Sequence, residues 1–316
     1  METKIRVGVS SCLLGNAVRY DGGHKRDRYI TDVLAGYFHF VPVCPEVECG
    51  LPVPRESLRL VGDVDNPQLI TIRTKMDHTE RMRSYCRQRV RALEEENLCG
   101  FIFKKDSPSS GLYRVKLYIS PNNSIRKARG LFAASMVEHF PLLPVEEEGR
   151  LKEATLRENF IERVFCYSRW KDFLQDSPGY KSLMAFHARH KLLIMAHSPR
   201  HFASMGKLVA AGKRTPPAEL LSTYETSLMQ AMALTATTKK HVNVLQHIMG
   251  YFKKFLTKDE KAELLQIIRD YADKTVPLVV PLTLINHYIR KYDVPYLKNQ
   301  LYLEPHPSEL MLRNHV

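Results

Sequence analysis

The chain has 316 residues, 44% of them hydrophobic, and six cysteines that lack the dense, regular spacing of a disulfide scaffold. This length and composition predict a globular, cytoplasmic protein of about two domains. No apolar run reaches the roughly 20 residues of a membrane helix, and no cleavage site follows the charged start, so we expect neither a membrane span nor a signal peptide. The formal net charge of +13, mostly in the second half, fits either RNA or DNA contact or an ordinary basic surface.

Three segments of the first half share one pattern, in which a short apolar run gives way to a loop of small residues. The apolar runs are expected to be buried strands. If these strands are parallel, their loops meet at one edge of the sheet, which is where ligands bind in open α/β sheets. The three segments cover residues 5–15, 38–50 and 101–111.

Helical periodicity and capping residues predict helices between these strands, and two more strands follow the third loop. Strands that alternate with helices favour an α/β domain with a Rossmann-like, mostly parallel sheet. The helices are expected at residues 27–35, 79–96 and 130–139, and the further strands at residues 115–119 and 141–145.

A polar, charged segment at residues 146–150 marks a change in the sequence pattern. From residue 151 onward the apolar positions recur at helical spacing, and clusters of proline and glycine separate about six or seven helices. The sequence therefore predicts an α/β domain over residues 1–148 and an all-α domain over residues 151–316.

Cys12, Cys44 and Cys49 lie in the loops that follow the first two strands. No Cys-x-x-Cys pair occurs, which disfavours a structural zinc site. An iron–sulfur cluster held by three thiolates would leave one iron open to act as a Lewis acid or to bind a soft sulfur atom. The spacing alone leaves a cluster and a buried core position equally open, because free cysteine is commonly buried.

Five short motifs lie in and around these loops. They are Ser11-Cys12-Leu13-Leu14-Gly15, Arg19-Tyr20-Asp21-Gly22, Cys44-Pro45-Glu46, Pro54-Arg55-Glu56 and residues 104–111. Together they resemble the thiouracil desulfurase family, and the resemblance covers residues 4–145. It implies a 4Fe-4S enzyme that removes sulfur from a thiolated pyrimidine, a thiouracil-like nucleobase or nucleoside, and releases the oxo-pyrimidine and sulfide.

The resemblance implies three cluster ligands, of which the first two match Cys12 and Cys44. The third belongs to a Ser-Pro-Ser-Cys-Gly loop, and this chain has Ser110 at that position. A serine oxygen is a harder iron ligand than a thiolate. Three possibilities stay open: Cys49 replaces the missing thiolate, Ser110 itself binds iron, or the cluster is lost.

Polar residues of the loops are predicted to act on the substrate, and for Glu46 the prediction agrees with the family's Cys-Pro-Glu motif. Glu46 and Ser107 are the predicted catalytic residues, with Glu46 transferring a proton. Ser11, Arg55 and Ser109 are predicted to bind the substrate. The alternatives are that Glu46 only pairs with Arg55 and that the serines only stabilise their loop.

The second half resembles the YbgA-like helical domain, from which no activity carries over. His187, His190 and His197 fall near one face of an expected helix. A metal site, a polar core network and an anion-binding surface all stay open for these histidines, because the sequence does not show convergence. The resemblance rests on residues 186–191, 241–254 and 312–316.

A second function, from a different class, is also compatible with the sequence. In this interpretation Ser110 marks the loss of the cluster. The basic helical half would then make the chain a nucleic-acid-associated binding protein.

Overall fold

The computed structural model describes residues 4–315 and divides the chain after Glu153 into two compact units. The first unit contains strands and helices, and the described part of the second contains helices only. This confirms the predicted fold class, an α/β domain with a mostly parallel sheet followed by an all-α domain. Among the described helices none has the length and apolar character needed to cross a membrane.

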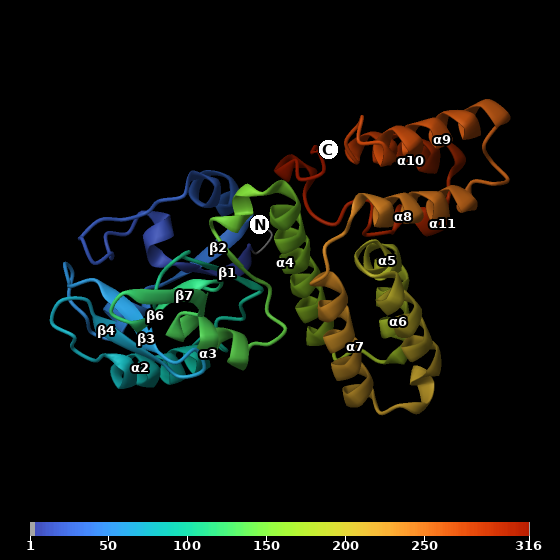
Figure 1. Ribbon diagram of the computed structural model, residues 1–316. Helices are drawn as coiled ribbons and strands as arrows, with labels where there is room; N and C mark the ends of the chain where they lie inside the picture. Colours follow the sequence, from blue (N-terminus) through green and yellow to red (C-terminus); the bar gives the residue numbers. More distant parts are fainter. Residues whose placement is uncertain (1–3, 316) are drawn as a thin grey trace. The chain divides into compact units, whose positions relative to one another are not determined.

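The first sheet consists of parallel strands in the order β2-β1-β5-β8, of which Figure 1 labels β1 and β2. The central strands β1 and β5 are buried because their apolar side chains are covered on both faces of the sheet. The carboxyl ends of β2, β1 and β5 therefore lie side by side. The strands are β1 (Ile5–Ser10), β2 (Phe38–Val43), β5 (Gly100–Phe103) and β8 (Val145–Glu147).

A second sheet, in the order β4-β3-β6-β7, was not expected. It is built from two antiparallel hairpins, β3 with β4 and β6 with β7, and a parallel pairing of β3 with β6 joins them. Of its strands only β6 was predicted from the sequence, because the other three are short and polar at many positions. The strands are β3 (Leu58–Gly62), β4 (Pro67–Thr71), β6 (Val115–Ser120) and β7 (Asn123–Ala128).

Two longer helices of the first unit, α2 (Thr79–Ala92) and α3 (Leu131–His139), pack against each other. The predicted helix at residues 27–35 is instead a π turn, Tyr29–Val33, followed by a 3-10 turn, Leu34–Gly36. The loop after β2 forms a one-turn helix, α1 (Pro45–Glu48).

The second unit begins with the long helix α4, and seven further helices follow it among the described residues. Figure 1 labels α4 to α11 in this unit. Pro199 and Pro217 occupy the first turns of their helices, where the missing N–H costs nothing. In the core, Trp170 stacks on Tyr224 and contacts Phe186 edge to face. The helices are α4 (Ala154–Gln175), α5 (Tyr180–His197), α6 (Pro199–Ala211), α7 (Pro217–Met232), α8 (Thr238–Tyr251), α9 (Lys258–Ala272), α10 (Val279–Tyr292) and α11 (Pro295–Lys298).

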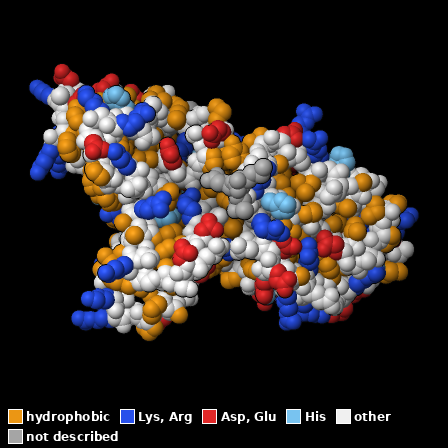
Figure 2. Space-filling model, turned by 180° about the vertical axis from the view of Figure 1, so that it is seen from behind, with side chains coloured by type: hydrophobic (Ala, Val, Ile, Leu, Met, Phe, Trp, Pro, Cys, Tyr) orange, Lys and Arg blue, Asp and Glu red, His pale blue; other side chains and the backbone are white. Residues whose placement is uncertain are grey.

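Charged side chains are dispersed on the face of the molecule that Figure 2 shows. Lys and Arg side chains lie among Asp and Glu side chains, and the described residues form no continuous basic stripe on this face. Proteins that bind nucleic acids commonly carry such a stripe, which contacts the phosphate backbone. This face therefore gives no support for a nucleic-acid partner beyond the net charge itself.

Candidate functional site

A cavity of about 490 Å³ lies at the carboxyl ends of β1, β2 and β5. The three loops of the sequence pattern form much of its wall, because their strands are parallel neighbours. The structure brings every predicted site residue except Cys49 to this cavity. Those residues are Ser11, Cys12, Cys44, Glu46, Arg55, Ser107, Ser109 and Ser110.

Cys12 and Cys44 place two thiols in the cavity wall. Cys12 lies in the 3-10 turn that follows β1, and Cys44 is the N-cap residue of α1. Burial raises the pKa of the Cys12 thiol to about 11, although Lys104 acts in the opposite direction. Burial likewise raises the pKa of Cys44. Both thiols are therefore protonated at neutral pH until a metal displaces the proton.

Cys49 does not line the cavity that Cys12 and Cys44 line. Its predicted part in a set of three cluster ligands stays a prediction. Cys44 and Cys49 occupy opposite ends of the helix α1. The Cys49 sulfur lies 3.3 Å from the Glu46 carbonyl oxygen, and Arg81 of α2 donates to the Cys49 carbonyl at 2.7 Å. Pro45 at the first helical position was the signal for this helix, since proline is common there.

Ser110 lies in a loop whose shape is held by Ser107. The Ser107 hydroxyl oxygen accepts the N–H groups of Ser109 at 3.3 Å and Ser110 at 3.1 Å. Ser110 is buried and lines the cavity. The Ser107 hydroxyl thus stabilises the loop that carries Ser110. The catalytic role predicted for Ser107 stays a prediction.

Glu46 is held in the cavity wall by two partners. Arg55 donates from Nε at 2.9 Å and from Nη2 at 2.6 Å to Oε2, and the Ser109 hydroxyl donates at 2.7 Å to Oε1. Both members of the ion pair are largely buried. The Ser107 and Ser109 hydroxyls are 3.0 Å apart. Because the Ser109 proton points to Glu46, Ser107 donates to Ser109, and the three groups form one hydrogen-bonded chain.

Basic side chains that the sequence analysis gave no role also line the cavity. They are Arg19, Lys25, Lys104 and Lys105. Lys104 forms an ion pair with Glu148, and Arg19 pairs with Asp21 at 3.3 Å. Arg19, Lys104 and Lys105 lie inside the motifs of the sequence pattern, so their place in the motifs could have identified them as cavity residues. These cations make the cavity suited to an electron-rich, polar ligand.

Gly130 packs directly against the loop that carries Ser110. A Cβ at Gly130 would lie 2.5 Å from the carbonyl carbon and oxygen of Ser109. We therefore expect Gly130→Ala to displace the Ser109–Ser110 peptide and to lower the free energy of unfolding by about 1 to 3 kcal/mol. Urea unfolding followed by circular dichroism measures this. Gly36→Ala is the control, because a Cβ at Gly36 meets nothing within 4 Å. Equal stability of the two variants would contradict the prediction.

Comparisons with known proteins match both units. Residues 7–148 match the family described as 2-thiouracil desulfurase, and residues 191–307 match the protein of unknown function DUF1722. The uncharacterized protein YbgA of Escherichia coli strain K12 is 30% identical over 134 residues, which are 42% of this chain and 79% of that protein. The uncharacterized protein YbbK of Bacillus subtilis strain 168 is 32% identical over 108 residues, which are 33% of this chain and 71% of that protein.

One solved structure is also similar to part of the chain. It is the [4Fe-4S]-dependent thiouracil desulfidase TudS, with 27% identity and a TM-score of 0.40, over 48% of this chain and 95% of that one. None of these descriptions mentions a nucleic acid. Contact with RNA or DNA therefore remains an expectation from net charge alone.

Proposed function

The chain belongs to the 2-thiouracil desulfurase family through residues 7–148, with a DUF1722 domain over residues 191–307, and on this basis we propose that it removes sulfur from a thiolated pyrimidine. The observation that carries the proposal is the meeting of Cys12, Cys44 and Glu46 in the wall of one cavity. A thiouracil-like base or nucleoside is the proposed substrate.

We propose that Cys12, Cys44 and Ser110 hold the 4Fe-4S cluster of the family. Two of these three residues have the thiols that iron–sulfur clusters require, and both thiols line the cavity. The third residue, Ser110, offers an oxygen in place of a sulfur. When bound, the cluster would supply a Lewis-acidic iron for the substrate's sulfur. Ser110 is the harder ligand, so the cluster is expected to be held less firmly than by three thiolates. Cys49 is outside the proposed set.

The reaction exchanges sulfur for oxygen without net electron transfer. Water adds its oxygen to the ring carbon, the carbon–sulfur bond breaks, and sulfur leaves as hydrogen sulfide. Glu46 is the proposed group that takes a proton from the water. Arg55 keeps this carboxylate in place, and the hydroxyl of Ser109 orients it from the other side. Arg55 is therefore a positioning residue, and Ser11 contributes to the wall that holds the substrate.

Iron and acid-labile sulfide content after anaerobic reconstitution tests the ligand set. We expect about four irons per chain in the natural protein, firmer retention in Ser110→Cys and loss in Ser110→Ala. Cys49→Ser is the matched control and should keep its iron, because Cys49 does not line the cavity.

Two outcomes would contradict this ligand set. Iron lost in Cys49→Ser would restore Cys49 as a ligand. No iron in the natural protein, together with iron in Ser110→Cys, would mean that the cluster has been lost in this chain, as the second function requires. Desulfuration of 2-thiouracil by the reconstituted protein, followed by its change in ultraviolet absorbance, then tests the activity itself.

A further inference from the structure

Three groups of the second unit that can bind metal converge in its core. Glu158 and Glu162 lie one turn apart on α4, and His306 lies in the segment that follows α11. One ligand atom from each of the three residues lies within 4.8 Å of the other two. All three side chains are buried, and they come from parts of the chain more than a hundred residues apart.

His306 has a nitrogen without a hydrogen-bond partner. Its side chain is 9% exposed, and Nε2 is buried with no partner among the described residues. The other nitrogen, Nδ1, lies 3.1 Å from the carbonyl oxygen of Pro307. Since a carbonyl oxygen can only accept, Nδ1 carries the proton and Nε2 presents a lone pair. An imidazole fixed through its other N–H to a carbonyl is typical of metal-bound histidine.

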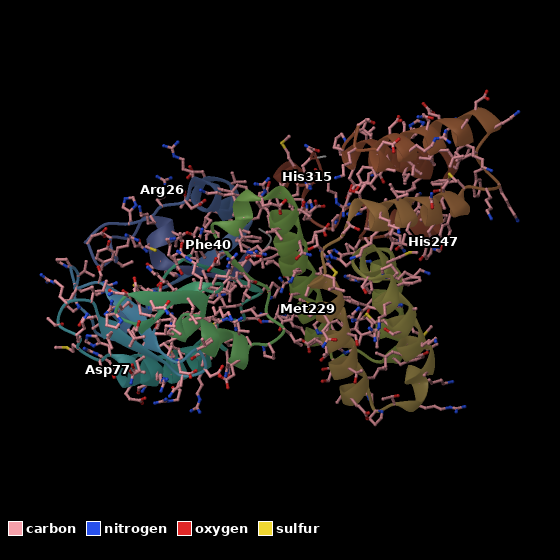
Figure 3. The ribbon with its side chains drawn as sticks, in the orientation of Figure 1. Arg26, Phe40, Asp77, Met229, His247 and His315 are labelled. Carbon is pink, nitrogen blue, oxygen red and sulfur yellow. The ribbon has the colours of Figure 1, made fainter. Side chains whose placement is uncertain are left out.

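The two carboxylates are held in place by neighbouring donors. Arg313 donates to Glu162 Oε1 at 2.7 Å and to Glu158 Oε1 at 3.3 Å, while His197 Nε2 lies 2.9 Å from Glu162 Oε2. His315 Nε2 lies 3.5 Å from Glu158 Oε2, and Figure 3 labels His315 beside α4. Each carboxylate oxygen has two lone pairs, so these contacts leave lone pairs for a cation.

A cavity of the second unit borders this group at Glu158. This cavity, of about 240 Å³, is lined by Glu158, Arg313 and His315 together with residues of α8 and the preceding turn. A hydrated ion fits a cavity of this size. The cavity belongs entirely to the second unit and is distinct from the cysteine cavity.

We propose that Glu158, Glu162 and His306 bind one divalent transition-metal cation, of the class of Zn²⁺ or Mn²⁺. Two carboxylate oxygens and one imidazole nitrogen suit this class, whereas Mg²⁺ and Ca²⁺ prefer oxygen ligands alone. The carboxylates offset the charge of the cation beside Arg313. The cation ties the C-terminal segment, which carries His306, to α4, and the site does not depend on the function proposed for the first unit.

Zinc content of the full chain tests the site. The Cys12→Ala, Cys44→Ala background removes the thiols of the first cavity; after chelation and dialysis against Zn²⁺ we expect about one zinc per chain. Adding His306→Gln should remove that zinc. Adding His287→Gln should not, because His287 is exposed on α10. Co²⁺ in the same background should give visible absorption without the sulfur-to-cobalt bands of a thiolate site.

Two results would overturn the proposal. If the Cys12→Ala, Cys44→Ala protein bound no zinc, the lone pair of His306 would accept a hydrogen bond from a protonated Glu158 and would not bind a metal. Equal zinc in the His306→Gln and His287→Gln proteins would place the metal elsewhere. The fluorescence of Trp170, the single tryptophan of the chain, shows whether each variant is folded in the second unit.

Discussion

Glu46→Gln is expected to lower kcat for desulfuration by about 10²- to 10⁴-fold, the range for loss of a general acid or base. Glutamine keeps an oxygen that accepts from Arg55, so the cavity wall should survive, but it cannot take up a proton at neutral pH. KM should change much less than kcat, because the substitution removes a group that acts in the transition state. Kinetics of 2-thiouracil desulfuration with the reconstituted enzyme measures both constants.

Glu80→Gln is the control for Glu46→Gln. Glu80 lies in the first turn of α2, outside the cavity, where its exposed carboxylate pairs with Arg83 at 3.2 Å. It should keep the natural kcat. Equal losses in the two variants, or a loss in Glu46→Gln that follows a loss of iron, would show that Glu46 supports the structure and does not transfer a proton.

Three strands of the parallel sheet, β1, β2 and β5, could be predicted because each is largely an apolar run, a pattern that does not depend on contacts elsewhere in the chain. The fourth strand, β8, consists of Val145-Glu146-Glu147, and it overlaps the strand predicted at residues 141–145 only at Val145. The strands β3, β4 and β7 have no such run, and they form only through pairing with each other and with β6. Their stability comes from cross-strand contacts, which a single sequence does not display.

The cavity could be predicted in part for the same reason. The parallel order of neighbouring strands brings the loops of Cys12, Cys44 and Ser110 to one edge of the sheet, and this does not depend on the exact conformation of each loop. The position of Cys49 depended instead on the local conformation of four residues, a helical turn in place of an open loop. The buried group of Glu158, Glu162 and His306 could not be predicted, because helix packing alone brings these residues together.

The buried ion-pair network of the second unit leads to the largest expected effect on stability. Arg313 pairs with both Glu158 and Glu162 and also donates to the Tyr302 carbonyl at 2.6 Å. Arg313→Met would leave two buried carboxylates without their guanidinium. We expect the free energy of unfolding of the second unit to fall by about 3 to 5 kcal/mol. Urea unfolding of the metal-free protein, followed by Trp170 fluorescence, reports on this unit.

Arg290→Met is the control for Arg313→Met. Arg290 lies on α10 and is exposed. Substitution there should change the free energy of unfolding by less than about 0.5 kcal/mol. Equal effects of the two substitutions would contradict a special role for the buried guanidinium.

We call the loss in free energy of unfolding of Arg313→Met, relative to the natural protein, the deficit. Its pH dependence shows whether Arg313 stabilises the second unit through its charge or through its packing. Burial and the nearby charge of Glu162 already raise the pKa of Glu158 to about 8, above its ordinary value of 4.5. Without Arg313 the folded state favours protonated carboxyls more strongly, so it loses stability relative to the unfolded chain as pH rises from about 5 to about 8. The deficit relative to the natural protein should therefore be larger at about pH 8 than at about pH 5.

Comparing the variant with the natural protein at each pH also removes the effect of His187, whose pKa is lowered to about 4 by burial and by Lys191. His241 differs, because its pKa is lowered to about 3 by burial and also by the charge of Arg313. Loss of Arg313 raises the pKa of His241, so acid destabilises the variant less through this ring, and the deficit again becomes smaller at low pH. A deficit that stayed constant between about pH 5 and about pH 8 would mean that Arg313 stabilises the unit through its packing against Tyr302. A deficit that grows with pH would assign the stabilisation to its charge.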